Sequence, residues 1–351
     1  SRLLEVLAAS TKLGLTSFGG PVAHIGYFHQ EYVVRRRWLD NHTYSDLVAL
    51  CQFLPGPASS QLGIALGILR AGLLGGLASW LGFTLPSALL MVAFAYGVQG
   101  FPTEQSAGWL HGLKIAAVAA VAQAVWSMGR TLCPDRARAT IGVLAAVLVL
   151  GAPSIGTQLL VIAAGGLAGW RLLGNSEEAP AAHLAAGYGK RLGLVILGIF
   201  FLLLVALPLL RQGIPSQPLA LFDSFYRAGS LVFGGGHVVL PLLRAEVVPP
   251  GWVSDAEFLA GYGAVQAAPG PLFTFSAYLG AVMKPEPNGW QGAAFALMAI
   301  FLPSYLLVAG GLPFWESVRM HPQCRAALSG INAAVVGLLA AALYNPVWTS
   351  A

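Results

Sequence analysis

Two basic residues stand at equivalent places ahead of two glycine-rich breaks. Lys12 lies six residues before Phe18–Gly20, and Arg227 lies six residues before Phe233–Gly235; both breaks read Phe-Gly-Gly. Their surroundings are apolar, and a cation buried in hydrocarbon is costly and usually functional. Two cations that approach one site from opposite sides would neutralise a doubly charged anion. The spacing therefore indicates an anion site.

Local ion pairing is the alternative interpretation of both cations. Asp223 precedes Arg227 by four residues, a spacing at which an ion pair forms along a helix. Glu5 lies two helical turns before Lys12, on a similar face. Either carboxylate could satisfy its cation without a ligand, so both interpretations stay open.

A second pair of breaks supplies helix N-termini. Pro55–Pro57 and Pro269–Pro271 both read Pro-Gly-Pro. The second proline suits the first turn of a new helix, because that position needs no N–H donor. A helix N-terminus carries free N–H groups and roughly half a positive charge, which makes it a natural anion site. The alternative is that glycine and proline only kink or pack the helices.

Hydroxyl, carboxyl and imidazole groups surround these breaks. Ser59 and Ser60 follow the first Pro-Gly-Pro, as Thr274 and Ser276 follow the second. A buried carboxylate or a histidine could carry a coupling proton, and a structural ion pair or hydrogen bond is the alternative. The candidate residues for proton coupling are Glu31, Glu246 and His24. The candidate substrate-binding residues are Lys12, Phe18, Gly19, Gly20, Pro21, Pro55, Gly56, Pro57, Ser59, Ser60, Arg227, Phe233, Gly234, Gly235, His237, Pro269, Gly270, Pro271 and Thr274.

The sequence lacks the patterns of other chemistries. No Ser-His-Asp, metal-ligand or phosphate-loop constellation is found. Cys51, Cys133 and Cys324 are widely spaced and form no CxxC pair, so a membrane-embedded reductase would have no redox centre. We therefore predict no cofactor, no metal and no enzymatic activity.

Composition places these residues in a membrane. The chain is 56% hydrophobic and only 9% charged over 351 residues, whereas soluble domains are about 25% charged. Apolar runs of membrane-spanning length include Ala71–Val98, Ala107–Trp126 and Lys190–Leu210. The net charge of +5 comes from bases in loops, which is typical of membrane orientation and argues against nucleic-acid binding. Arg2 and Glu5 near the start argue against a removable signal peptide.

The matched breaks belong to an internal repeat. Phe-Gly-Gly and the pair Glu31/Glu246 recur at an offset of 215 residues, and Pro-Gly-Pro recurs at 214. Further on, Pro86-Ser87 matches Pro303-Ser304 at an offset of 217. We predict two homologous units, residues 1–130 and 216–351, joined by linking transmembrane helices over 131–215.

Charge predicts that the two units have opposite orientations. The loop Gln30–Thr43 carries three arginines and is expected on the cytoplasmic side, with the N-terminus. Tyr44–Leu69, split by Pro-Gly-Pro into pieces too short to cross, is expected to form a re-entrant hairpin. The matching loop Arg244–Glu257 carries one base and three acids and is expected outside. The predicted fold is an all-α polytopic membrane protein with two inverted repeats whose broken helices meet near the midplane.

These motifs carry a family resemblance. "SFGGPVAHIGYFHQEYV" with "ALCQFLPGPASSQL", echoed by "VFGGGHVVLPLLRAEVV" with "AVQAAPGPLFTFSAYLG", resembles the chromate transporter family of the long, two-domain type. Gly236 stands where the first copy has Pro21. The resemblance implies export of chromate across the bacterial inner membrane, which confers chromate resistance, with sulfate as a chemical look-alike.

The sequence therefore predicts a multi-pass secondary transporter of a tetrahedral oxyanion, with chromate as its first candidate substrate. A transporter of sulfate or another oxyanion, or an anion channel with the same site, is the alternative. The expected partners are the substrate and the lipid bilayer, with no nucleic acid. The sequence leaves open whether the protein forms a homo-oligomer.

Overall fold

The computed structural model describes residues 1–100, 132–152, 155–173, 187–232, 238–315 and 321–344, together with scattered positions between 112 and 130. All regular elements in these residues are helices, and no strand occurs among them. In this part of the chain, the helices long and apolar enough to cross a membrane are Ala58–Gly97, Lys190–Gly213, Gly289–Phe314 and Pro322–Ala342. The predicted class, an all-α polytopic membrane protein, is confirmed. The predicted crossing Ala107–Trp126 lies largely outside the described residues.

The N-terminal part of the chain alternates helices with short breaks. In order, its elements are α1 (Arg2–Thr16), α2 (Gly20–Phe28), the π-helix η1 (His29–Arg35), α3 (Asn41–Phe53) and α4 (Ala58–Gly100). The Asp40 carboxylate caps α3 by accepting a hydrogen bond from Thr43 N–H. α4 is two helices joined at a kink, because Ala71 and Gly72 have non-helical backbone angles. Pro-Gly-Pro thus separates two consecutive helices, as predicted.

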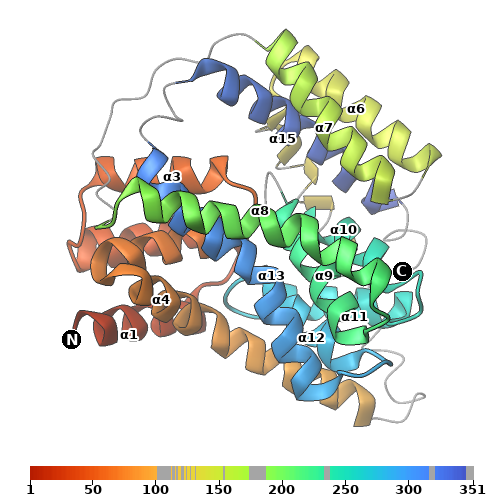
Figure 1. Cartoon of the computed structure of the whole chain (residues 1–351), viewed down its shortest axis with the longest axis horizontal. Coiled ribbons are helices and arrows are strands. Elements are labelled where there is room, and N and C mark those ends of the chain that lie inside the picture. The colour runs from red at the N-terminus through yellow and green to blue at the C-terminus, as the bar shows by residue number, and fades with distance from the viewer. Residues whose placement is uncertain are drawn as a thin grey trace.

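The C-terminal part also alternates helices with short breaks. They are α9 (Gln217–Ser230), α10 (Val239–Val247), α11 (Asp255–Ala267), the 3₁₀ turn η3 (Leu272–Thr274), α12 (Phe275–Val282), α13 (Gly289–Gly311), the 3₁₀ turn η4 (Leu312–Phe314) and α15 (Pro322–Ala342). Ser254 and Glu257 form a capping box that starts α11. The long helix α4 packs against α1 and also against α12 and α13, so it links the two parts (Figure 1).

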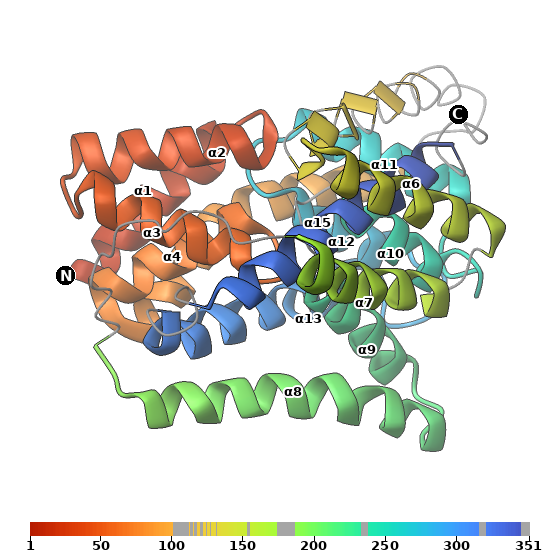
Figure 2. The same ribbon diagram turned by 90° about the horizontal axis from the view of Figure 1, so that it is seen from above.

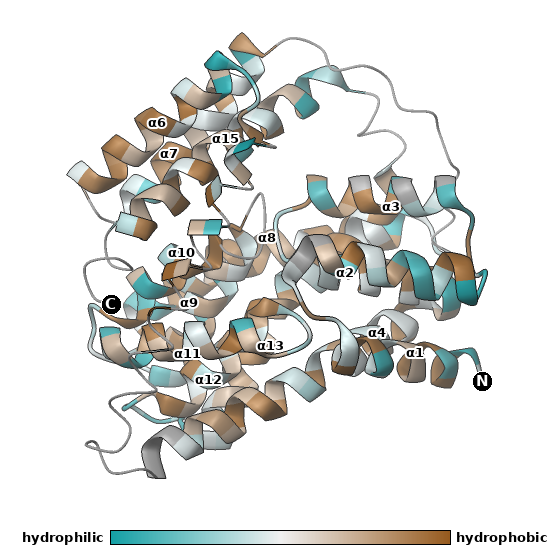
Figure 3. Ribbon diagram, turned by 180° about the vertical axis from the view of Figure 1, so that it is seen from behind, coloured by the Kyte–Doolittle hydropathy of each residue, from teal (hydrophilic) through white to brown (hydrophobic). Residues whose placement is uncertain are grey.

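Between these parts in sequence, the described residues form α6 (Arg136–Gly151), α7 (Ile155–Leu172) and α8 (Lys190–Gly213). α6 and α7 pack against α15, where Gly142 and Gly165 meet Gly337 and Gly330 at close backbone approach. α8 runs along one side of the molecule beside α13, as Figure 2 shows. Exposed large apolar residues on α6, α7 and α8 suit contact with lipid, and Figure 3 shows the mostly hydrophobic colouring of α6 and α7.

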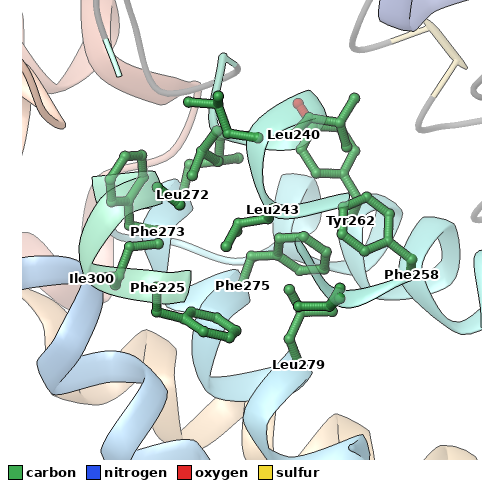
Figure 4. Packing of buried hydrophobic residues seen from close by; sticks show 14 of the residues in the cluster. Phe225, Leu240, Leu243, Phe258, Tyr262, Leu272, Phe273, Phe275, Leu279 and Ile300 are labelled. Carbon is green, nitrogen blue, oxygen red and sulfur yellow. The ribbon is translucent and has the colours of Figure 1, made fainter. Parts of the chain in front are cut away.

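The second Pro-Gly-Pro is surrounded by a dense aromatic core. Phe225 of α9, Phe258 of α11, and Phe273 and Phe275 beyond Pro271 are fully buried and pack together (Figure 4). A second cluster of buried residues, with Leu47, Leu62 and Leu66 among its members, covers the first Pro-Gly-Pro. Both breaks therefore lie inside the protein, where irregular backbone is tolerated at membrane depth.

Candidate functional site

Each Pro-Gly-Pro break forms a hydrogen bond with the opposite part of the chain. Gly56 N–H donates to Val232 O at 2.6 Å, and Gly270 N–H donates to Ser17 O at 2.8 Å. Ser17 and Val232 are the residues directly before the two Phe-Gly-Gly motifs. The same hydrogen bond therefore forms twice: from the N-terminal Pro-Gly-Pro to the C-terminal part, and from the C-terminal Pro-Gly-Pro to the N-terminal part. Each Pro-Gly-Pro lies beside the end of a helix from the other part.

Only the first Phe-Gly-Gly belongs to the described residues. Gly19 and Gly20 have φ of 92° and 78°, a left-handed backbone that ends α1 and turns the chain into α2. Phe18 is half exposed. Outside the described part lie the side chain of Pro21 and the residues Phe233, Gly234, Gly235 and His237.

A larger residue would be strained at the central glycine of either Pro-Gly-Pro break. Gly56 has φ of 130° and Gly270 has φ of 92°. A Cβ atom on Gly56 would lie 2.6 Å from Ser304 Oγ and still closer to Gln61 Nε2. A Cβ atom on Gly270 would lie 3.0 Å from the Ser87 Cβ. The matched serines Ser87 and Ser304 thus each contact the Pro-Gly-Pro of the opposite part.

The first Pro-Gly-Pro leads into α4 with polar side chains around its first turn. Ser59 Oγ lies 3.2 Å from His24 Nδ1. Gln61 Nε2 donates to Pro55 O at 2.6 Å and holds the turn closed. Ser60 Oγ is buried and has no hydrogen-bond partner among the described residues. The predicted helix N-terminus is present here, one residue after Pro57.

The second Pro-Gly-Pro differs from the prediction of a helix that starts at Pro271. Pro271 has an extended backbone, a 3₁₀ turn follows, and α12 begins only at Phe275. Thr274 Oγ1 donates to Pro271 O at 2.8 Å and lies 2.6 Å from Ser87 Oγ, while Ser276 Oγ donates to Phe273 O at 2.7 Å. These hydroxyls bind backbone carbonyls three residues earlier, which favours a tight turn over an open helix end.

The predicted cation Lys12 is part of an ionic cluster, which we call the N-terminal cluster (Lys12, Glu31, Arg35 and Arg36). Lys12 Nζ lies 2.5 Å from Glu31 Oε2, Arg36 Nε lies 2.8 Å from Glu31 Oε1, and Arg35 contributes a longer contact of 3.4 Å. Burial alone would raise the pKa of the Glu31 carboxyl, but hydrogen bonds from Lys12 and Arg36 hold that pKa below its usual value. Glu31 is thus surrounded by groups that favour its ionised form.

The predicted cation Arg227 lies in a matching C-terminal cluster (Arg211, Asp223, Arg227 and Glu246, with Ser224). Arg227 binds Asp223 through two hydrogen bonds of 2.9 Å and lies 3.0 Å from Glu246 Oε1. Arg211 of α8 lies 3.1 Å from Asp223 Oδ2, and Ser224 Oγ donates to Glu246 Oε2 at 2.6 Å. The pair Arg227–Glu246 occupies the same repeat positions as Lys12–Glu31.

Both cations form ion pairs with carboxylates. Only the pair of Arg227 with Asp223 is the local one that the i,i+4 alternative named. Glu5, the local partner named for Lys12, was wrong: Lys12 binds Glu31, while Glu5 binds Arg70 at 2.9 Å. A role of either cation in substrate binding stays a prediction, as does proton coupling by Glu31, Glu246 or His24.

Several polar residues of this region escaped the sequence-based search. Gln61, Ser87 and Ser304 line the Pro-Gly-Pro breaks, and Arg36 and Arg211 complete the ionic clusters. A signal existed for the serines, because Pro86-Ser87 and Pro303-Ser304 are matched landmarks of the repeat. Arg211 lies outside both repeat units and has no such signal. Among the described residues, no group of His, Cys, Asp and Glu is arranged to hold a metal ion.

Comparison with known proteins assigns the family. The family described as "Chromate transporter" matches residues 4–170 and 219–351. The chain belongs to the chromate transporter family. It is 32% identical over 347 residues to a chromate transport protein of Pseudomonas aeruginosa. The matched residues make up 96% of this chain and 79% of the relative. It is 29% identical over 354 residues to a chromate transport protein of Cupriavidus metallidurans, which covers 97% and 82%.

A more distant relative extends the range of organisms. The chain is 24% identical over 346 residues to an uncharacterized transporter of Methanocaldococcus jannaschii, which covers 96% of this chain and 83% of the relative. No solved structure matches. The chromate transporter family is a family of transporters rather than enzymes, so this chain is a multi-pass membrane protein of a transporter family.

Proposed function

We propose that this protein exports chromate across the bacterial inner membrane as a secondary transporter. The support is the family assignment and the relatives named as chromate transport proteins that cover most of the chain. Chromate is a tetrahedral dianion, and a helix N-terminus with hydroxyl donors, as at the start of α4, suits an oxyanion of that shape. The candidate site is formed by the Phe-Gly-Gly and Pro-Gly-Pro breaks, flanked by Lys12 and Arg227.

The mechanism that we propose is alternating access between two inverted units, residues 1–130 and 216–351. The observation that carries it is the pair of reciprocal hydrogen bonds, Gly56 to Val232 and Gly270 to Ser17. Two equivalent contacts in opposite directions are what a pseudo-two-fold axis between the units would produce. Broken helices that meet at the interface of inverted repeats form the binding site in many transporters. Rocking of one unit against the other would open the site to each side in turn.

The decisive experiment is transport of chromate and sulfate by the purified protein in proteoliposomes with imposed pH and voltage gradients. We expect chromate accumulation against its own gradient, driven by one of these gradients, because secondary transport is coupled. Accumulation against a gradient would exclude the channel alternative. Strictly downhill, uncoupled flux would instead refute the secondary transporter, and transport of sulfate alone would refute chromate as the substrate.

A further inference from the structure

Two matched pairs of buried hydroxyls differ in their hydrogen bonding. Near the second Pro-Gly-Pro, Thr274 and Ser87 form a hydrogen bond of 2.6 Å. Their repeat equivalents near the first Pro-Gly-Pro are Ser60 and Ser304. Ser60 is 2% exposed and Ser304 is 0% exposed, yet neither hydroxyl has a partner in the described part of the chain. A buried hydroxyl without a partner calls for an explanation, such as a bound water, ion or ligand.

The two unpartnered hydroxyls belong to the same small region around Gly56. Ser60 lies in the first turn of α4, which begins two residues after Gly56. Ser304 comes from α13, and its Oγ lies 2.6 Å from where a Cβ atom of Gly56 would stand. Gln61, which is 0% exposed, approaches the same position, and its Oε1 also lacks a partner. Polar atoms from both repeat units therefore meet at the N-terminus of α4.

The charge of the region favours an anion over a cation. Uncharged oxygens alone could coordinate Na⁺, but the first turn of α4 presents free N–H groups and the positive end of a helix dipole. The two predicted cations are both engaged in ion pairs, Lys12 with Glu31 and Arg227 with Asp223 and Glu246. Recognition of an anion here would rest on neutral donors.

We infer that the oxyanion binds at the first Pro-Gly-Pro, between the N-terminus of α4 and α13, with Ser60 and Ser304 as its side-chain donors. This inference rests on the proposed function and narrows it to one of the two breaks. The second break, where Thr274 and Ser87 bind each other, has no free hydroxyl in the matched pair and serves as a structural counterpart.

The test is the dependence of chromate transport and binding on these two hydroxyls. We expect Ser60→Ala and Ser304→Ala each to raise the KM for chromate about tenfold, because each loses one hydrogen bond to a charged ligand, with a smaller effect on kcat. Ser60→Thr keeps a hydroxyl and copies the residue of the second break, so its KM should stay near that of the wild type. Thr140→Ala is the control, because this exposed hydroxyl of α6 donates only to Arg136 O and lies outside the candidate site; it should change KM by less than about twofold.

A second readout separates this inference from the proposed function. In detergent, chromate should raise the thermal unfolding midpoint of the wild type and of Ser60→Thr, and it should raise that of Ser304→Ala much less. Wild-type transport together with unchanged KM in both alanine variants would overturn the inference and leave the function intact. Absence of chromate transport in the wild type would instead refute the function. Stabilisation by Na⁺ in place of chromate, lost in Ser304→Ala, would overturn the assignment of an anion.

Discussion

The two ionic clusters each contain a basic residue paired with a glutamate at matched positions, Lys12 with Glu31 and Arg227 with Glu246, but the charges around the two pairs differ. In the N-terminal cluster, one carboxylate faces three basic side chains, and the Lys12 side chain is 44% exposed. In the C-terminal cluster, two carboxylates face two arginines, and the Asp223 side chain is fully buried. The first cluster thus keeps an excess of positive charge at an accessible position, while the second is balanced and shielded.

If the two predicted repeat units are homologous, this difference shows how one scaffold can be specialised. An accessible excess of positive charge attracts anions from solution, so in the proposed function the N-terminal cluster would recruit the dianion on the side that we predict to be cytoplasmic. A balanced buried cluster holds helices together, because removal of one member leaves an uncompensated charge. The two Pro-Gly-Pro breaks also differ in their hydrogen bonding. The hydroxyls of Ser60 and Ser304 near the first break have no partner among the described residues, whereas those of Ser87 and Thr274 near the second bind each other.

The comparison depends on the two units facing opposite sides, and labelling tests that directly. We expect a cysteine at Arg136 to react only from the cytoplasmic side and a cysteine at Lys284 only from outside; both positions are exposed. The native cysteines must first be replaced, with Ala at the buried Cys51. Accessibility of the Lys284 position from the cytoplasm would rule out the inverted arrangement.

Alanine at the central glycines should have the largest effect on stability in both units. Gly56→Ala and Gly270→Ala should each lower the free energy of unfolding by about 3–5 kcal/mol, because overpacking adds to left-handed backbone strain. The effect should be larger at Gly56, where a Cβ atom meets closer neighbours. Thermal unfolding in detergent measures this.

Gly97→Ala is the control for both substitutions, because a Cβ atom there meets nothing within 4 Å. We expect its unfolding midpoint to equal or slightly exceed that of the wild type, because alanine favours a helix interior more than glycine does. If Gly56→Ala were as stable as this control, the close contact with Ser304 could not exist in solution.

Removal of the matched cations should distinguish the two clusters. Arg227→Ala leaves the buried Asp223 with fewer partners and should cost about 3 kcal/mol. Lys12→Ala leaves Glu31 bound to Arg36 and should cost about 1 kcal/mol or less, since Lys12 is partly exposed. Arg35→Ala, which removes a 3.4 Å contact of an exposed side chain, is the control without a measurable effect. Equal losses for Lys12 and Arg227 would contradict the difference between the clusters.

The smallest expected effect is on the pH dependence of stability. The pKa of Glu31 is lowered in the folded protein, so its ion pairs stabilise the fold above its unfolded pKa and are lost as the pH falls through the lower, folded value. The difference in unfolding midpoint between the wild type and Glu31→Gln should therefore shrink on acidification below about pH 4.5. A difference that stays constant from neutral pH to pH 3 would show that the cations do not act on Glu31.

Part of the site could be predicted because its signals are local or repeated. Phe-Gly-Gly and Pro-Gly-Pro identify the breaks by residue type alone, since glycine and proline restrict the backbone in known ways. The i,i+4 spacing of Asp223 and Arg227 indicated their ion pair. The helix predicted to start at Pro271 starts only at Phe275, because the hydroxyls of Thr274 and Ser276 bind backbone carbonyls around a 3₁₀ turn. Residue propensities alone do not show whether such a turn or an α-helix will form.

The sequence by itself determined the class of the protein, its family and the positions of the broken helices, because composition, periodicity and motif spacing are properties of neighbouring residues. Only the tertiary structure decided that Lys12 meets Glu31, that Ser304 lies against Gly56, and that one of two matched hydroxyl pairs is closed. These contacts join residues 19 to 248 positions apart. Their distances depend on how whole helices pack, and an ångström of displacement separates a hydrogen bond from none.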